Sequence, residues 1–127
     1  MSVQVIDREL ERLEELWADG LSDAYRSYLS AVQSFAADAQ PKLALAAALI
    51  EVGLRLQGLG GPAAPPAALL MGDLCLARAS RLLADTASQP VQVAFAGAIE
   101  ELATSAASGA VGRPVRDLLL DAFEPRR

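Results

Sequence analysis

The stretch Leu43-Ala44-Leu45-Ala46-Ala47-Ala48-Leu49-Ile50 decides the fold of this 127-residue chain. Ala and Leu lose little conformational freedom on entering a helix, and Pro41 suits a first helical turn, so a helix is predicted from about 41 to 57. The first half of this helix is apolar all round, and such a helix is buried on every side. Glu51 and Arg55 are one turn apart and mark where one face reaches water or the two side chains reach each other.

Further helices are predicted on both sides of this segment. Apolar residues recur at three- and four-residue steps over about residues 4–37, and the stripe shifts phase after Gly20, which indicates two helices or one kinked helix. Gly and Pro interrupt the helical pattern at 58–66, and a second break falls at 109–112. The remaining segments are predicted as helices at 66–86, 90–108 and 115–123. The sequence therefore predicts an all-α bundle of about five helices, folded as a single domain over residues 1–127.

Composition and charge narrow the class of function. A net charge of −5 with scattered arginines argues against nucleic acid, which needs a clustered basic surface. The N-terminus lacks the features of a signal peptide, and Leu43–Ile50, the longest uncharged apolar run, is far shorter than the ~20 residues that span a bilayer. We therefore expect a cytoplasmic protein with no membrane span. Because 53% of the residues are hydrophobic, another subunit is expected to cover part of the apolar surface.

No catalytic or metal-binding residue is expected in this chain. Histidine is absent, which removes the usual catalytic triads and the commonest zinc ligand. Cys75 lies in an apolar helix with no base to activate it, so it is expected to be an inert core residue. The pairs Asp19/Asp23 and Asp117/Asp121 have a spacing that suits magnesium, but the first spans a helix break and the second lies on a solvated face. Capping or surface roles are expected for both pairs.

One longer pattern resembles a known family. The segment Gly72-Asp73-Leu74-Cys75-Leu76-Ala77-Arg78-Ala79-Ser80-Arg81-Leu82-Leu83-Ala84, followed by Ala98-Ile99-Glu100-Glu101-Leu102-Ala103, is similar to two consecutive helices of the trans-polyprenyl diphosphate synthases. The resemblance covers roughly residues 41–109 and implies the N-terminal half of the isoprenoid synthase fold. It also implies that Gly72 permits close approach of a neighbouring helix, and that Asp73 bonds to a backbone amide or an arginine.

The motifs that carry this family's chemistry are missing. Where the synthases have their first Asp-Asp-x-x-Asp motif, the chain reads Leu49-Ile50-Glu51-Val52-Gly53-Leu54-Arg55-Leu56-Gln57-Gly58. Where they have a diphosphate-binding Gly-Lys-x-x-Arg-Pro motif, it reads Ala39-Gln40-Pro41-Lys42-Leu43-Ala44, and Lys42 alone remains. The resemblance therefore implies no cofactor in this chain, with Mg²⁺ held by a catalytic partner.

Some members of this family are heteromers that contain a small subunit without these motifs. The resemblance implies that this chain is such a subunit, not an enzyme alone, which binds a catalytic prenyl diphosphate synthase and supports its activity and product length. The expected partner interface consists of Leu74, Ala77, Arg78, Arg81, Ile99 and Leu102. The side chains expected to wall the partner's elongation cavity are Leu70, Leu74 and Phe95.

Without its partner the chain is expected to form a homodimer. Two other functions stay open at this point. One is a homodimeric helical-bundle interaction protein with no isoprenoid role. The other is a carrier that holds an apolar ligand in the Ala-lined space between helices.

Overall fold

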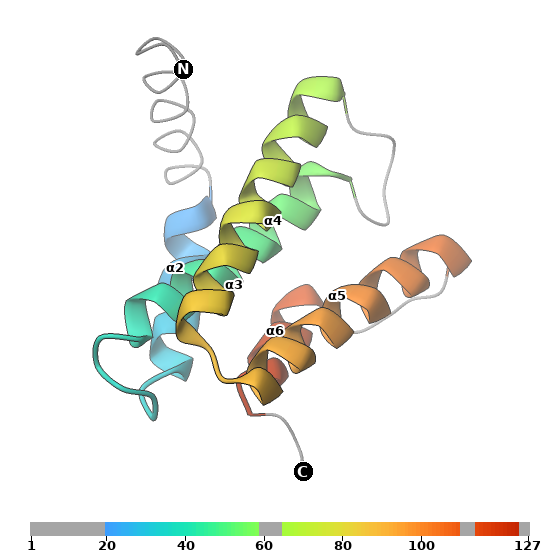
Figure 1. Cartoon of the computed structure of the whole chain (residues 1–127). Helices are drawn as coiled ribbons and strands as arrows, with labels where there is room; N and C mark the ends of the chain where they lie inside the picture. Colours follow the sequence, from blue (N-terminus) through green and yellow to red (C-terminus); the bar gives the residue numbers. More distant parts are fainter. Residues whose placement is uncertain (1–19, 59–64, 110–113, 125–127) are drawn as a thin grey trace, which may run out of the picture.

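The computed structural model describes residues 20–58, 65–109 and 114–124. Within these ranges the chain forms five helices and no strand, so the predicted all-α class is confirmed (Figure 1). The helices are α2 (Ser22–Ala31), α3 (Gln40–Leu56), α4 (Pro66–Thr86), α5 (Gln89–Ser108) and α6 (Val115–Ala122). The predicted helical stripe before Gly20 and most of the predicted break at 58–66 lie outside the described residues.

Prolines explain why three of these helices begin where they do. Pro41, Pro66 and Pro90 occupy the first or second position of α3, α4 and α5, where a missing backbone N–H costs nothing. The prediction was wrong at the end of α2, which stops at Ala31 instead of continuing to about residue 37. The side-chain amide of Gln40 donates to the backbone oxygens of Gln33 and Phe35 at 3.2 and 2.9 Å. These two hydrogen bonds stabilise the connection that leads the chain into α3.

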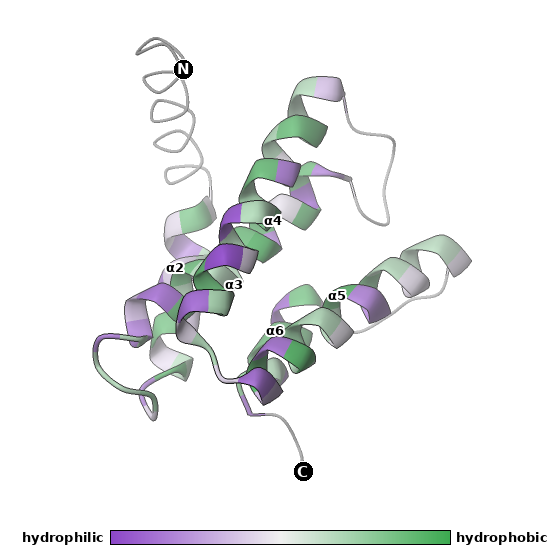
Figure 2. Ribbon diagram, in the orientation of Figure 1, coloured by the Kyte–Doolittle hydropathy of each residue, from purple (hydrophilic) through white to green (hydrophobic). Residues whose placement is uncertain are grey.

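Helix α3 is the centre of the molecule. It packs against α4, α2 and α6, and eleven of its seventeen residues are buried, including all but one of Leu43–Ile50. Burial on every side is what an all-round apolar helix requires, so the prediction for this segment is confirmed. Helix α4 is different, because it buries only one stripe. Its N-terminal half is mostly hydrophobic and its hydrophilic residues gather in the C-terminal half (Figure 2).

Two glycines set the distance between α3 and α4. A Cβ atom on Gly72 would lie 2.8 Å from the backbone oxygen of Gly53 and 2.5 Å from the Cγ atom of Gln57. A Cβ on Gly53 would in turn lie 3.1 Å from the backbone oxygen of Gly72. The close helix approach expected at Gly72 is therefore confirmed. Asp73 differs from expectation, because its carboxylate accepts a 2.6 Å hydrogen bond from the side-chain amide of Gln57.

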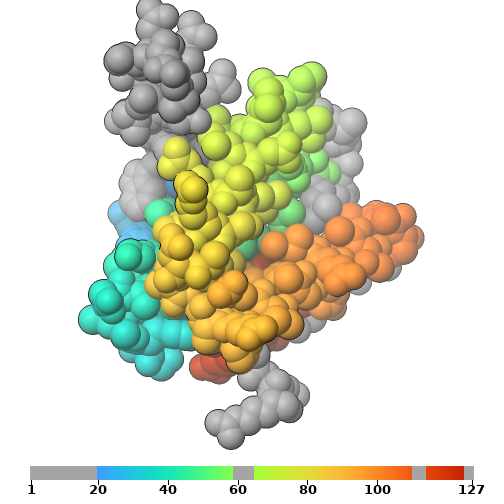
Figure 3. Space-filling model, viewed as in Figure 1, coloured from blue at the N-terminus to red at the C-terminus, as the bar shows by residue number. Residues whose placement is uncertain are grey.

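Helices α5 and α6 form a hairpin that is joined to the rest of the chain by large side chains. The ring of Phe123, directly after α6, makes edge contacts with Phe95, Phe35 and Tyr28 at centroid distances of 5.0, 6.0 and 6.3 Å. Such contacts add to the apolar burial of each ring. The other end of α5 extends away from this cluster and protrudes from the body (Figure 3).

Candidate partner-binding groove

A groove with a volume of about 550 Å³ runs between α3 and α4, and we call it the α3–α4 groove. Helix α4 turns Gly72, Cys75, Ala79 and Leu83 into the core, so the residues on its other face are left beside the groove. The described residues that line the groove are Leu45 and Leu49 of α3 and Leu74, Ala77, Arg78, Arg81, Leu82 and Asp85 of α4. Leucines and an alanine thus form an apolar surface, with two arginines and an aspartate along it.

The groove brings together four of the six residues predicted for the partner interface. Leu74, Ala77, Arg78 and Arg81 line it side by side, as their spacing along one helical face requires. The other two, Ile99 and Leu102, lie on α5 and are not among its lining residues. Leu102 is buried within this chain and Ile99 is packed against its core. The predicted interface is therefore one surface on α4 and a separate, mostly internal, pair on α5.

The three residues predicted to wall an elongation cavity do not form a common surface. Leu70 is 71% exposed near the start of α4, whereas Leu74 lies within the groove. Phe95 is fully buried against Phe123 in this chain's own aromatic cluster. It therefore has no surface to offer a partner's cavity, and its predicted role is corrected to that of a core residue. The α5 stripe from which it was chosen faces inward, because the hairpin needs that stripe to attach.

Cys75 lies behind the groove in the core. Burial raises the pKa of its thiol above the ordinary value, and the positive charge of Arg78 offsets only part of that effect. A buried thiol with a raised pKa stays protonated at neutral pH and is a poor nucleophile. This environment agrees with the inert role expected from the sequence.

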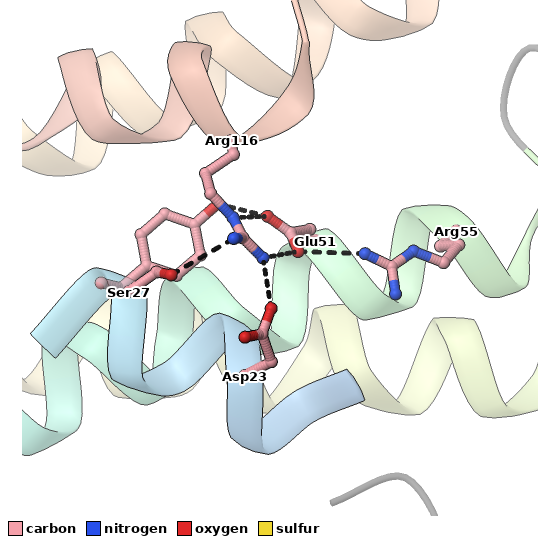
Figure 4. A network of polar contacts seen from close by, with 6 residues as sticks. Asp23, Ser27, Glu51, Arg55 and Arg116 are labelled. Atoms are coloured by element: carbon pink, nitrogen blue, oxygen red, sulfur yellow. Dashed lines mark hydrogen bonds and ion pairs between the residues drawn. The ribbon is translucent and has the colours of Figure 1, made fainter. Parts of the chain in front are cut away.

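A second polar centre surrounds Glu51, on the part of α3 that faces α2 and α6 (Figure 4). The side chain of Glu51 is only 5% exposed. Its Oε1 atom accepts hydrogen bonds from the Tyr28 hydroxyl at 2.8 Å and from Arg116 Nε at 3.0 Å. Its Oε2 atom accepts from Arg116 Nη2 at 2.8 Å and from Arg55 Nη2 at 3.1 Å. The carboxylate therefore receives four donors, two of them in a bidentate pair with Arg116.

The charges in this network reinforce one another. Burial alone would favour the neutral acid of Glu51, but the hydrogen bonds from Arg116 and Tyr28 and the charges of both arginines outweigh it, and its pKa lies below the ordinary value. Burial and the neighbouring carboxylate raise the pKa of Tyr28, which keeps its hydroxyl a donor. The hydrogen bond to Glu51 raises the pKa of Arg116. Arg116 extends the network to Ser27 at 3.2 Å and to Asp23 at 3.5 Å.

This network occupies the segment where the resemblance would put the first aspartate-rich motif. Glu51 has no capacity to spare for a metal ion, because both of its oxygens already accept two hydrogen bonds. Within residues 20–58, 65–109 and 114–124, no three His, Cys, Asp or Glu side chains gather as metal ligands would. Asp23 of the first predicted aspartate pair contacts Arg116 at the surface, which is a role of the kind expected.

The sequence signalled only part of this network. The pairing of Glu51 with Arg55 followed from their spacing, but Tyr28 and Arg116 were not anticipated. One signal was present: a single carboxylate inside an otherwise apolar buried helix needs a partner from elsewhere in the fold. That rule demands a cation without saying which of the ten arginines supplies it.

Comparison with protein-family models, with curated proteins and with solved structures finds no match to this chain. The resemblance to the polyprenyl diphosphate synthases thus rests on the sequence motif alone. Among the helices that the structure describes, none is long and apolar enough to cross a membrane.

Proposed function

We propose that the chain is a non-catalytic, cytoplasmic small subunit that binds a catalytic trans-polyprenyl diphosphate synthase and supports its activity and product length. The observation that carries the proposal is the α3–α4 groove, which is lined by the part of the Gly-Asp helix expected to form the interface. The catalytic partner supplies Mg²⁺ and the aspartate-rich motifs.

The shape and charge of the groove indicate what would fill it. Leu45, Leu49 and Leu74 offer an apolar strip of the kind that receives one face of an amphipathic helix. Two arginines and one aspartate, Asp85, lie along the strip, and this excess of positive charge favours a partner helix with acidic residues next to its apolar stripe. We therefore expect the groove to receive such a helix from the synthase.

Two further features support a role in assembly over a role in chemistry. Leu69 and Leu70 are neighbouring large apolar side chains left exposed on α4, the helix that lines the groove. The carboxylate of Glu51 is held by two arginines and a tyrosine, which makes it unsuited to bind a metal-bridged diphosphate. A homodimer in the absence of the synthase would use the same surfaces.

The test is the substitution Ala77→Trp in the groove. A tryptophan there would overpack a docked helix, at a typical cost of about 1–3 kcal/mol, so binding to the synthase should weaken roughly 5- to 150-fold. Ala96→Trp, at an exposed alanine of α5 outside the groove, is the matched control and should bind like the wild type. Circular dichroism checks the fold of both variants, and isothermal titration calorimetry with a co-encoded synthase measures the affinity.

Three outcomes separate the alternatives. If Ala77→Trp alone weakens binding and lowers the activity of the mixed enzyme, the subunit proposal is supported. A synthase that is fully active alone, with a product length that ignores this chain, would contradict it. If light scattering then shows a dimer that Ala77→Trp dissociates, the chain is a homodimeric interaction protein instead.

A further inference from the structure

A separate cavity adjoins the Glu51 network on the other side of α3 from the groove. It has a volume of about 440 Å³, and its lining residues within the described ranges are Glu51, Leu54, Arg55, Val115 and Arg116. None of them lines the α3–α4 groove. The cavity thus lies between α3 and the start of α6. Beside it, two guanidinium groups donate hydrogen bonds to the buried carboxylate of Glu51 (Figure 4).

The cavity has hydrogen-bond donors to spare. A guanidinium carries five N–H groups. Arg55 directs one of them to Glu51 and has no other protein acceptor within the described residues, and its side chain is 60% exposed. Arg116 donates to Glu51, Ser27 and Asp23 and is one-third exposed. Among the described residues, the other four N–H groups of Arg55 therefore have no protein acceptor at the edge of the cavity.

The charges at the cavity favour a negative ligand. Glu51 can neutralise only one of the two arginines that it binds, so the three groups together carry one positive charge. Among the described residues, Asp23 brings a further carboxylate to Arg116 at 3.5 Å, but it is largely exposed, so solvent screens it strongly. A small anion in the cavity would balance the remaining positive charge.

Arg55 is also held in position before any ligand binds. Its Nη2 atom is tied to Glu51 at 3.1 Å. Its Nη1 atom lies against Gly20, where a Cβ atom would be only 3.1 Å away. Gly20 has a φ of 134°, a conformation that other residues rarely adopt, and its missing side chain leaves space for the guanidinium. A donor group that one hydrogen bond already orients loses less freedom on binding than a free one.

We propose that this cavity is a binding site for a small organic anion, with an oxyanion head on the N–H groups of Arg55 that do not bind Glu51 and a short aliphatic body against Leu54 and Val115. Carboxylate and phosphate heads both match the planar donor pattern of a guanidinium. Because Glu51 already takes part of the positive charge, the affinity is modest, with a Kd on the order of 1 mM.

The experiment is a titration of the ¹⁵N-labelled full chain with butyrate, and separately with inorganic phosphate, at constant ionic strength. The expected result is a saturable change in amide shifts centred on residues 54–55 and 115–116. Butyrate that binds more tightly than acetate would show that the aliphatic wall contributes. No saturable change at up to about 50 mM of either anion, well above the expected Kd, would overturn the proposal.

Two variants of opposite sign sharpen the test. Arg55→Gln removes the main donor and should weaken binding about tenfold, whereas Asp23→Asn removes a repelling charge that contacts Arg116 and should tighten binding by at most about twofold. Both residues are exposed, so the fold should survive. The controls change charge equally but elsewhere: Arg26→Gln on α2 and Asp38→Asn in the turn before α3 should leave the affinity unchanged. If the controls shift the affinity as much as the cavity variants do, the effect is non-specific charge screening and the site is refuted.

Discussion

The contact between α3 and α4 and the attachment of the α5–α6 hairpin are built in opposite ways. Helices α3 and α4 approach until two glycines touch, with little more than backbone between their axes at Gly53 and Gly72. The hairpin instead reaches the body through the ring of Phe123 and the guanidinium of Arg116. A contact made of small residues is sensitive to added atoms, whereas a contact made of a few large side chains is sensitive to their removal.

The largest effect is expected from Phe123→Ala. This substitution removes the ring that contacts Phe95, Phe35 and Tyr28 at once, and truncation of a buried Phe typically costs about 3–5 kcal/mol. Urea denaturation followed by circular dichroism measures the loss. Phe35→Ala is the comparison, because Phe35 is only partly buried and should cost clearly less. Equal losses would mean that Phe123 is not the centre of the attachment.

The second-largest effect is expected from Arg116→Met, which should lower the free energy of unfolding by about 3 kcal/mol. It leaves Glu51 buried without its bidentate partner, and breaking a buried ion pair from one side costs about 3–5 kcal/mol. The value belongs at the low end because Arg55 and Tyr28 still donate to the carboxylate. The double variant Glu51→Leu with Arg116→Met should recover much of the loss, since an apolar pair needs no compensation. A double variant less stable than Arg116→Met alone would contradict this account.

A smaller effect on stability is expected from pH, and we expect it to arise from the titration of Glu51. Its pKa is lower in the folded chain than the ordinary value of 4.5, so the folded state holds the ionised form more strongly than the unfolded state does. The resulting stability is fully present above about pH 5.5 and is lost as the pH falls through the folded pKa, by at most about 1.4 kcal/mol per pH unit for this one group. Denaturation curves from pH 7 to pH 3 measure it. Glu51→Gln should flatten the acid limb, and an unchanged limb would assign it to other carboxylates.

The smallest effects on stability are expected from two Gly→Ala substitutions, one destabilising and one stabilising. Gly72→Ala pushes a Cβ into the backbone of Gly53, and overpacking of this kind outweighs the gain in helix propensity, for a net loss of about 1 kcal/mol. Gly97→Ala is the matched control in α5, where a Cβ meets nothing within 4 Å, and it should gain about 0.5–1 kcal/mol. Thermal unfolding of both variants decides the matter. Stabilisation by both would show that the α3–α4 contact can open without cost.

The same two regions show which features of the structure could be predicted from the sequence. The helices around the central apolar stretch were predicted within a residue or two of α3, α4 and α5, because periodicity, prolines and glycines are local signals. The spacing in the Gly-Asp helix also placed Leu74, Ala77, Arg78 and Arg81 on one face, and all four line the α3–α4 groove. Local spacing is enough to place residues on one face of one helix.

The relation between helices could not be read in this way. Phe95 and Leu102 share the apolar stripe of α5, and periodicity alone does not say whether such a stripe faces the core or a partner. Similarly, Arg116 looked like any surface arginine, because its role depends on where α6 packs. The connection after the early end of α2 receives hydrogen bonds from the side chain of Gln40, in the following helix. Each miss involves a contact between segments whose spatial relation no local pattern encodes.

The distance along the chain between Glu51 and Arg116 also sets an order of events during synthesis. These residues are 65 positions apart, so a ribosome completes α3 several seconds, at typical rates, before it releases the arginine. Throughout that interval the carboxylate of Glu51 must stay hydrated or take up a proton, because burial of its charge is costly without the guanidinium of Arg116. The face of α3 that carries Glu51 therefore stays exposed to solvent while the nascent chain grows. It becomes buried only when α6 brings Arg116 to the carboxylate.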